Sequence, residues 1–464
     1  MAFLLLYLSI LSYGVSQYFR GREGDFKHFF WAAEAVVEGK DIYASGEGGY
    51  LYPPLFAAAL SPLARISFVA AAGTWAVVNV LCLAVGALLF AHEALRRLGG
   101  PVGLVRGDTV GLALLGSAVL FDKVRGIVSM GQTDGLVLLC AALALRTLGT
   151  RREARATSRA SLGAVVCGGA LGLAMNVKYL AIVFLPYFIL RRRWREASSM
   201  VVMTVAFALL SAVAVGWERN LGYLGDALAA LGEVVGVTSS HDSNPHPLTW
   251  ERSVSVTSAV GKFMEARGMA RFALPLSGLI AFGVACSAWW IYRARGAALF
   301  VGRGGAWDDE ASNAGNGPAL VLMEWAGVLV GTVAFSPQTT SRHAILAMPM
   351  VMAGLVVAVG TAGRARRAAS IVANEGAQEA AAHAGGPNVP ARVAAGLGVL
   401  VVALSLYLPP TGDGFEAAVA WWRDVGGIGW CLCAGYLMVL WAALEGGRRN
   451  TNQRGSESRR PALS

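Results

Sequence analysis

Long apolar runs, separated by short clusters of charged residues, cover most of the chain. A helix of about 20 apolar residues crosses the hydrocarbon core of a bilayer, and several runs reach that length. No segment alternates apolar and polar residues as the strands of a membrane barrel do. The pattern therefore predicts an all-α, polytopic integral membrane protein, a helical bundle with about 12 spans. We place these spans at 2–19, 68–91, 109–121, 127–145, 161–177, 179–190, 198–216, 272–292, 319–335, 343–361, 393–408 and 427–444.

Some segments differ from the spans in composition. The stretch 51–66 is apolar but contains Pro53, Pro54 and Pro62, and proline kinks a helix, so we expect a re-entrant or surface-lying piece. The first span lacks a basic leader and a cleavage site, so we expect it to be retained. The expected organisation is a transmembrane core over 1–361, a flexible cytoplasmic linker over 362–392, C-terminal spans within 393–444 and a disordered basic tail over 445–464.

The distribution of charged residues also predicts how the spans are oriented in the membrane. Of 464 residues, 55% are hydrophobic and 15% are charged, against about 25% charged residues in soluble chains, and the net charge is +10. We interpret the excess of Lys and Arg as topological signals rather than a nucleic-acid surface, because the basic loops fall on one side of the predicted bundle. We expect that side, and both termini, to be cytoplasmic. The basic clusters lie at 146–159, 191–195, 364–367 and 448–460.

Two long loops, 20–50 and 217–271, then face the extracytoplasmic side, and short turns at 122–126, 336–342 and 409–426 lie there too. Asp25 lies directly beyond the first span and precedes a helical pattern over 29–37, which predicts a helix on the membrane surface. Asp25 could simply cap this helix, a position that aspartate favours.

Other polar residues lie at the same predicted face. Gln132 and Asp134 open one span, Lys178 ends another, and Arg342 closes a polar turn. Lys178 could instead snorkel to the headgroups, and Arg342 could anchor the chain at the interface. Taken together, an acid, two cations and an amide suit a reaction in which a lipid phosphate leaves. The cations would stabilise the phosphate charge, and the carboxylate would take the proton from an attacking hydroxyl.

Several short motifs occur in an order that one enzyme family shares. They are Gly24-Asp25-Phe26 followed by Ala35, Gly39 and Tyr43; Tyr52-Pro53-Pro54-Leu55; Gly131-Gln132; Lys178 before Arg191-Arg192-Arg193-Trp194-Arg195; and Ser336-Pro337 before Arg342-His343. With these motifs the chain resembles glycosyltransferase family 87, the polyprenol-phosphate-mannose-dependent glycosyltransferases with the GT-C fold. The motifs span 24–349, and the remainder of the chain contributes only hydropathy.

The resemblance implies an inverting transferase. It would move a sugar, mannose above all, from a polyprenyl-phosphate donor to a hydroxyl of a glycolipid or glycan acceptor on the extracytoplasmic face of the cell membrane. It implies that Asp25 is the general base and that Lys178, Arg342 and His343 bind the donor phosphate. The residues that we expect to line the substrate cavity are His28, Tyr52, Gln132, Asp134, Asn176, Ser336 and Gln338. No cofactor, metal or nucleic-acid partner is expected, because Lys and Arg can neutralise a lipid phosphate.

The chain departs from the family pattern in two respects. Asp134 stands where the family often has asparagine, and a carboxylate near a phosphate is unfavourable unless it is paired, so Lys123 or Arg125 is its expected partner. The loop acid has no second acid beside it, unlike GT-C members with a paired-acid motif. Asp308-Asp309 looks like a metal-binding pair, but the expected topology places it in the cytoplasm.

Two other classes of protein compete with an enzyme. A transporter or flippase of lipid-linked or charged solutes would need ionisable residues at mid-depth and broken helices in two related halves. The polar residues of this chain gather instead at the outer ends of the spans. A membrane scaffold without catalytic activity would not require an ordered set of motifs. We therefore expect a membrane glycosyltransferase and keep the transporter as the alternative.

Overall fold

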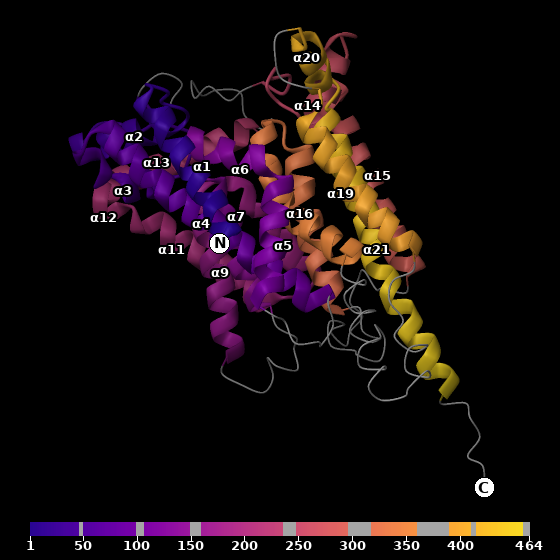
Figure 1. Cartoon of the computed structure of the whole chain (residues 1–464). Coiled ribbons are helices and arrows are strands. Elements are labelled where there is room, and N and C mark those ends of the chain that lie inside the picture. Colours follow the sequence, from indigo (N-terminus) through magenta and orange to yellow (C-terminus); the bar gives the residue numbers. More distant parts are fainter. Residues whose placement is uncertain are drawn as a thin grey trace. The chain divides into compact units, whose positions relative to one another are not determined.

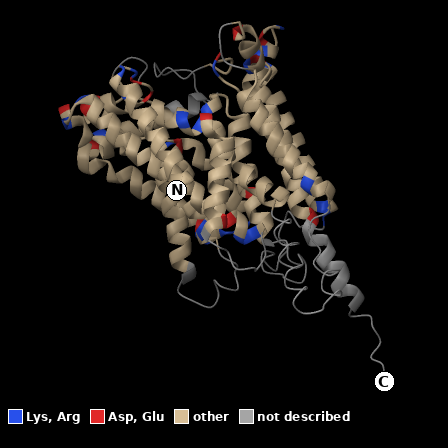
Figure 2. Ribbon diagram, in the orientation of Figure 1, with Lys and Arg blue, Asp and Glu red and all other residues tan. Residues whose placement is uncertain are grey.

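The structure is a computed structural model that describes residues 1–45, 50–98, 106–148, 159–234, 247–295, 317–359, 389–409 and 414–457. Every regular element in this part of the chain is helical, so the all-α fold class is confirmed (Figure 1). Lys, Arg, Asp and Glu lie mainly near the ends of the helices, and the middles of the helices contain few of them (Figure 2). That distribution is typical of helices that cross a bilayer.

The chain divides into two compact units, one formed by residues 1–89 and 121–247 and the other by residues 90–120 and 248–464. The first unit contains α1 (Ala2–Phe19), α2 (Phe26–Glu38), α3 (Pro54–Leu60), η1 (Leu63–Arg65), most of α4 (Phe68–Leu98), α6 (Phe121–Met130), α7 (Asp134–Thr147), α9 (Arg159–Val177), η2 (Tyr179–Val183), α10 (Phe184–Leu190), α11 (Trp194–Leu210), α12 (Ala212–Val215) and α13 (Trp217–Val234). Within it, α9 packs against α7 on one side and α11 on the other.

The second unit contains the end of α4, α5 (Arg106–Val119), α14 (Val256–Glu265), η3 (Ala270–Phe272), α15 (Ala273–Ala294), α16 (Gly317–Phe335), η4 (Ser341–Ala347), a helix over 348–359, α19 (Val389–Tyr407), α20 (Glu416–Asp424) and α21 (Gly427–Glu457). The helices α19 and α21 run side by side (Figure 1), and Gly398 and Gly435 face each other where they touch. Small residues at such a contact let two membrane helices approach closely.

Within the described residues, eight helices are long and apolar enough to span a membrane, and a bent pair makes up to nine. Shorter apolar helices cover Gly107–Val119, Ser161–Val177 and Tyr179–Leu190. Each segment that the sequence predicted as a span therefore has an apolar helical counterpart. The outward face of α15 carries Leu279, Phe282 and Trp290, each about two-thirds exposed, as a lipid-facing surface requires.

One predicted span is wrong in detail. The segment 127–145 is not a single helix, because α6 ends at Met130 and α7 begins at Asp134 with a bend of 120° between them. The predicted outer turn 122–126 lies inside α6. Hydropathy averages over about 19 residues, so it does not register a break of three residues within an apolar run.

The predicted loops and tail contain more helix than expected. The helix expected over 29–37 is α2, and the proline-rich stretch 51–66 forms the short helices α3 and η1. At the C-terminal end, α19 begins at Val389, within the predicted linker, and α21 continues to Glu457, within the predicted tail. Once a helix has formed, adding a residue to it costs little free energy. This explains why α19 and α21 extend beyond the apolar segments that predicted them. Most of the linker, and the pair at 308–309, lie outside the described residues.

Candidate functional site

The break between α6 and α7 is built by a glycine. The amide of Gly131 donates to the carbonyl of Val128, and the amide of Gln132 donates to that of Ile127. These two bonds form a Schellman motif, which requires a left-handed residue, and Gly131 has φ of 67°. The helix therefore ends sharply after Met130. Residues 131–133, which we call the elbow, present their backbone to neighbouring elements.

The start of the first outer loop docks on this elbow. The amide of Asp25 donates to the carbonyl of Met130 over 2.9 Å. Gly24 has φ of 59°, and a Cβ atom there would lie 2.8 Å from the oxygen of Met130. A Cβ atom at Gly131 would lie 2.5 Å from that of Phe26. The glycines of the Gly-Asp-Phe and Gly-Gln motifs are therefore what allows the two segments to touch.

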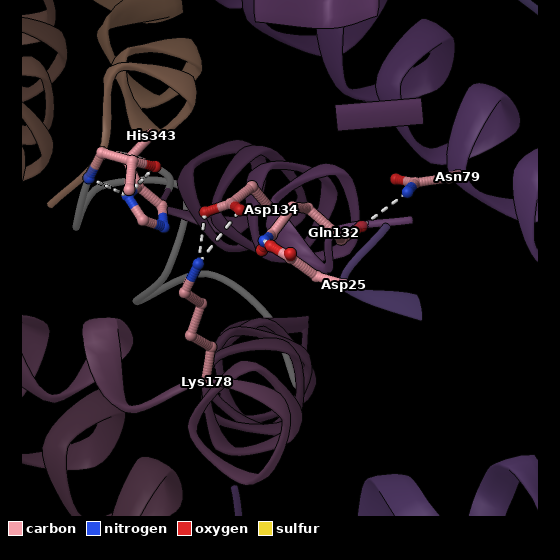
Figure 3. Close-up of polar contacts among 7 residues, drawn as sticks. Asp25, Asn79, Gln132, Asp134, Lys178 and His343 are labelled. Carbon is pink, nitrogen blue, oxygen red and sulfur yellow. Dashed lines mark hydrogen bonds and ion pairs between the residues drawn. The ribbon is translucent and has the colours of Figure 1, made fainter. Parts of the chain in front are cut away.

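This contact places the carboxylate of Asp25 against the side chain of Gln132. Asp25 occupies the N-cap position of α2, but its side chain makes no capping hydrogen bond. Its Oδ2 instead accepts a hydrogen bond from Nε2 of Gln132 (Figure 3). Asp25 is partly exposed, whereas Gln132 is buried. The helix-cap alternative therefore does not account for the side chain of Asp25.

Beyond the elbow, a buried ion pair joins α7 to the end of α9. Nζ of Lys178 lies 2.9 and 3.0 Å from the two carboxylate oxygens of Asp134 (Figure 3). Asp134 is fully buried and Lys178 is 8% exposed. Lys178 therefore does not snorkel away from the protein, and the predicted partners of Asp134 are wrong. Lys123 and Arg125 pair instead with Asp122, which lies one and three residues away from them on the same helix.

His28 follows Asp25 by three residues on α2, and Tyr52 packs against the same helix. The amide of His28 donates to the carbonyl of Asp25, and its Nδ1 is buried without a hydrogen-bond partner among the described residues. Burial lowers the pKa of His28, and the charge of Lys27 lowers it further, while Asp25 acts in the opposite direction. The ring of Tyr52 lies 5.5 Å from that of Phe29, one turn after Asp25. Its carbonyl accepts a hydrogen bond from Tyr43.

Asn176 is part of a helix contact. Its Nδ2 donates to the carbonyls of Gly172 and Thr204, at 2.9 and 3.0 Å, and so connects α9 to α11. Asn176 is buried, and these bonds satisfy its amide group there. Its expected place in a substrate cavity stays a prediction.

The remaining predicted site residues belong to the second unit. Ser336 and Gln338 are partly exposed between α16 and η4, and Arg342 and His343 lie in the first turn of η4. Thr340 and His343 form a capping box, in which Nδ1 of His343 accepts from the amide of Thr340 over 2.9 Å. The ring of His343 thus has a fixed orientation, with Nδ1 occupied. Their roles toward a donor stay predictions.

Two residues that the sequence analysis missed also contact the elbow. Trp75 and Asn79, both on α4, donate side-chain hydrogen bonds to the carbonyls of Gly131 and Gln132. Only their spacing of four residues on one helix face could have signalled this role, and nothing in the sequence points to the elbow as their target.

The site leaves several buried polar atoms without a partner among the described residues. They are Nδ1 of His28, Oδ1 of Asn79, Oε1 of Gln132 and Oγ1 of Thr133. Buried polar atoms normally form hydrogen bonds with protein, water or ligand. Hydroxyl groups of a substrate could therefore form the missing hydrogen bonds with these atoms. No group of three His, Cys, Asp or Glu in the described part of the chain could hold a metal ion.

Comparisons with known proteins place the chain in a family. The model of glycosyltransferase family 87 matches residues 50–305, which is more than half of the chain. No curated protein matches the sequence. Among solved structures, ArnT from Cupriavidus metallidurans in the apo state is 18% identical with a TM-score of 0.40, covering 92% of this chain and 73% of that one. ArnT bound to undecaprenyl phosphate is 16% identical with a TM-score of 0.44, covering 100% and 80%.

Structural likeness at these TM-scores does not establish a shared fold, so the assignment depends on the family model. That match includes the elbow, Asp134 and Lys178, and it begins after Asp25. It agrees with the order of motifs in the sequence. The chain belongs to glycosyltransferase family 87 and is a multi-pass membrane glycosyltransferase.

Proposed function

We propose that the protein transfers a sugar, mannose as expected for the family, from a polyprenyl-phosphate donor to a hydroxyl of a glycolipid or glycan acceptor on the extracytoplasmic face. The observation that carries the proposal is the position of Asp25. Its carboxylate leaves the cap of its own helix and lies against Gln132, two residues from the buried pair of Asp134 and Lys178. An acid and a cation that are distant in the sequence thus each contact a residue of the short segment 132–134.

In the proposed reaction Asp25 is the general base. The acceptor oxygen attacks the anomeric carbon from the face opposite the phosphate and forms the new glycosidic bond. The bond between that carbon and the phosphate oxygen breaks, and polyprenyl phosphate leaves with the electron pair. The acceptor proton passes to the carboxylate of Asp25, and the anomeric configuration inverts. The amide of Gln132 holds the carboxylate for this step.

Lys178 binds the departing phosphate in this proposal, and Asp134 constrains how it does so. The lysine is already engaged by a buried carboxylate, so the donor phosphate has to share or displace that contact. Asp25, Asp134 and Lys178 together carry a formal charge of −1, which disfavours an anionic donor. Further cations are therefore needed, and Arg342 and His343 are our candidates for them.

A transporter is the alternative function, and two features of the structure fit it. The bend between α6 and α7 is a broken helix, and the pair of Asp134 and Lys178 is ionisable and buried. Both features lie inside the region that matches a transferase family. We therefore interpret them as parts of a catalytic site.

The test of the proposal is the substitution Asp25→Asn. The purified variant and the wild type are assayed with radiolabelled polyprenyl-phosphate mannose and a membrane glycolipid extract. Loss of a general base lowers transfer by about 10²- to 10⁴-fold, while binding of the donor stays nearly intact. Asp41→Asn is the matched control, because Asp41 lies in the same loop and, among the described residues, its carboxylate accepts a local hydrogen bond from the amide of Tyr43. Normal turnover by Asp25→Asn would disprove the assignment of the base.

A further inference from the structure

Two side chains of α4 hold the elbow by its main chain. Nε1 of Trp75 donates to the carbonyl of Gly131 over 2.8 Å, and Nδ2 of Asn79 donates to the carbonyl of Gln132 over 2.5 Å. Figure 3 shows the second of these bonds. Trp75 is 4% and Asn79 is 1% exposed. Two successive peptide groups of the elbow are therefore fixed to one face of a long helix.

This attachment controls the residue that touches Asp25. The carbonyl that Asn79 holds and the amide that reaches Asp25 both belong to Gln132. The amide of Gln132 is bonded to the end of α6, but between Gln132 and α7 the chain is not helical, so its carbonyl belongs to no helix. The bonds from α4 therefore fix the carbonyl side of Gln132, while the bonds from α6 fix its amide side.

Trp75 also contacts the other side of the same junction. Its indole ring lies parallel to the ring of Phe26, with centroids 6.5 Å apart, and Phe26 follows Asp25 directly. One side chain thus touches both the residue before Gln132 and the residue after Asp25. Gly135 supplies the space for Asn79, because any side chain at Gly135 would collide with it.

We propose that Trp75 and Asn79 are positioning residues for the transfer reaction: they fix Gln132 relative to Asp25 and so orient the base toward the acceptor hydroxyl. The inference rests on the proposed role of Asp25. Neither residue needs to touch substrate. Each acts through the elbow, Trp75 through the carbonyl of Gly131 and Asn79 through that of Gln132.

A purely structural role would also explain buried hydrogen bonds, and the two roles differ in one measurable respect. If α4 acts on the reaction through the Gln132 amide, removing that amide removes the effect of α4 on turnover. If α4 only stabilises the fold, its effects on turnover and those of Gln132 are independent and multiply. Stability should respond to the α4 substitutions in either case.

The experiment combines Asn79→Leu and Trp75→Phe with Gln132→Met, which keeps the side-chain length and removes the amide. Apparent kcat, donor KM and thermal midpoint are measured for every single and double variant, with polyprenyl-phosphate mannose and a glycolipid extract. We expect each α4 substitution alone to lower kcat about ten-fold, because small displacements of a catalytic group are costly, with donor KM changed less than about two-fold. In the Gln132→Met background neither α4 substitution should lower kcat further, although both still lower the thermal midpoint.

Matched controls are available elsewhere in the chain. Asn220 is equally buried and donates its amide to the carbonyl of Ala208. Trp422 donates its indole N–H to the carbonyl of Ser405. Asn220→Leu and Trp422→Phe should lower the thermal midpoint and leave kcat within about two-fold, since an ordinary hydrogen bond contributes to stability only.

The outcomes separate this inference from the proposed function. Unchanged kcat in Trp75→Phe and Asn79→Leu, or losses that multiply with that of Gln132→Met, would overturn the positioning role. Trp75→Phe keeps the aromatic ring, so it tests the inference even if Asn79→Leu does not fold. An active Asp25→Asn variant in the same assay would instead overturn the role of the base.

Discussion

The two carboxylates on either side of the elbow have opposite surroundings. Asp25 is partly exposed and is held by a neutral amide, whereas Asp134 is fully buried and is held by a lysine. A neutral donor orients a carboxylate without cancelling its charge, and a buried cation cancels it. In the proposed reaction Asp25 therefore stays available to accept a proton, whereas Asp134 holds the lysine.

The same difference determines how each side should respond to substitution. We call the surroundings of Asp25 the open side and those of Asp134 the closed side. Because Asp25 is partly exposed, its replacement should affect folding little, and the defect should appear in turnover. On the closed side, removal of either partner leaves a buried charge, so defects should appear first in stability. The predictions below test this separation, beginning with the largest effect.

The substitution Lys178→Met should be the most disruptive. It leaves Asp134 buried and unpaired, which typically costs about 3 to 5 kcal/mol of folding free energy. Combining it with Asp134→Leu removes both charges and should restore the free energy of unfolding to within about 1 to 2 kcal/mol of wild type. Unfolding of the purified variants in detergent, followed by fluorescence, measures the change.

Donor binding by the double variant then separates the two roles of Lys178. If the lysine holds phosphate, donor KM stays raised by about ten-fold or more even though stability has recovered, because a charge-assisted contact is lost. A stable double variant with wild-type donor KM would show that the pair is structural only. In that case the closed side of the elbow has no direct part in catalysis.

Hydropathy predicted where the helices lie, because apolar length is a property of each segment alone. It failed at the elbow, since Gly131 interrupts a run that remains apolar on average. The partners predicted for Asp134 from the charged residues near it in the sequence were also wrong. Lys123 and Arg125 are nearer in the sequence, but the pairing depends on how the start of α7 meets the end of α9.

The candidate site shows the same limit. Asp25, Gln132 and Lys178 could be proposed because their residue types suit phosphate and proton transfer. Trp75 and Asn79 could not, because their side chains act on backbone carbonyls that any residue supplies. Contacts of that kind leave no signature in the identity of the partner residue.

The next prediction concerns the glycine that brings the two sides together. Gly131→Ala places a Cβ atom against Phe26 and forces a left-handed conformation on alanine. The control is Gly21→Ala. Gly21 has φ of 74° and open space around it, so alanine there has only the conformational cost. The control should lose about 1 kcal/mol of stability. Gly131→Ala should lose more than that and should also lower kcat, because the Asp25 segment is pushed off the elbow. Equal unfolding free energies and equal kcat for the two variants would contradict the role of this contact.

The smallest effect expected is a pH dependence on the open side, where protonation of His28 would place a cation beside Asp25 and make this side resemble the closed one. Burial lowers the pKa of His28 below its usual 6.5, so the unfolded chain binds the proton more readily than the folded protein does. The stability that neutral His28 contributes is therefore fully present above pH 6.5 and is lost as the pH falls through the lowered pKa.

His28→Gln removes this proton uptake, so its thermal midpoint should fall less than that of wild type between pH 7.5 and pH 5, by about 1 to 2 °C. Parallel curves for the two proteins would mean that His28 is as easily protonated in the folded state as in the unfolded one, and that burial does not keep it neutral.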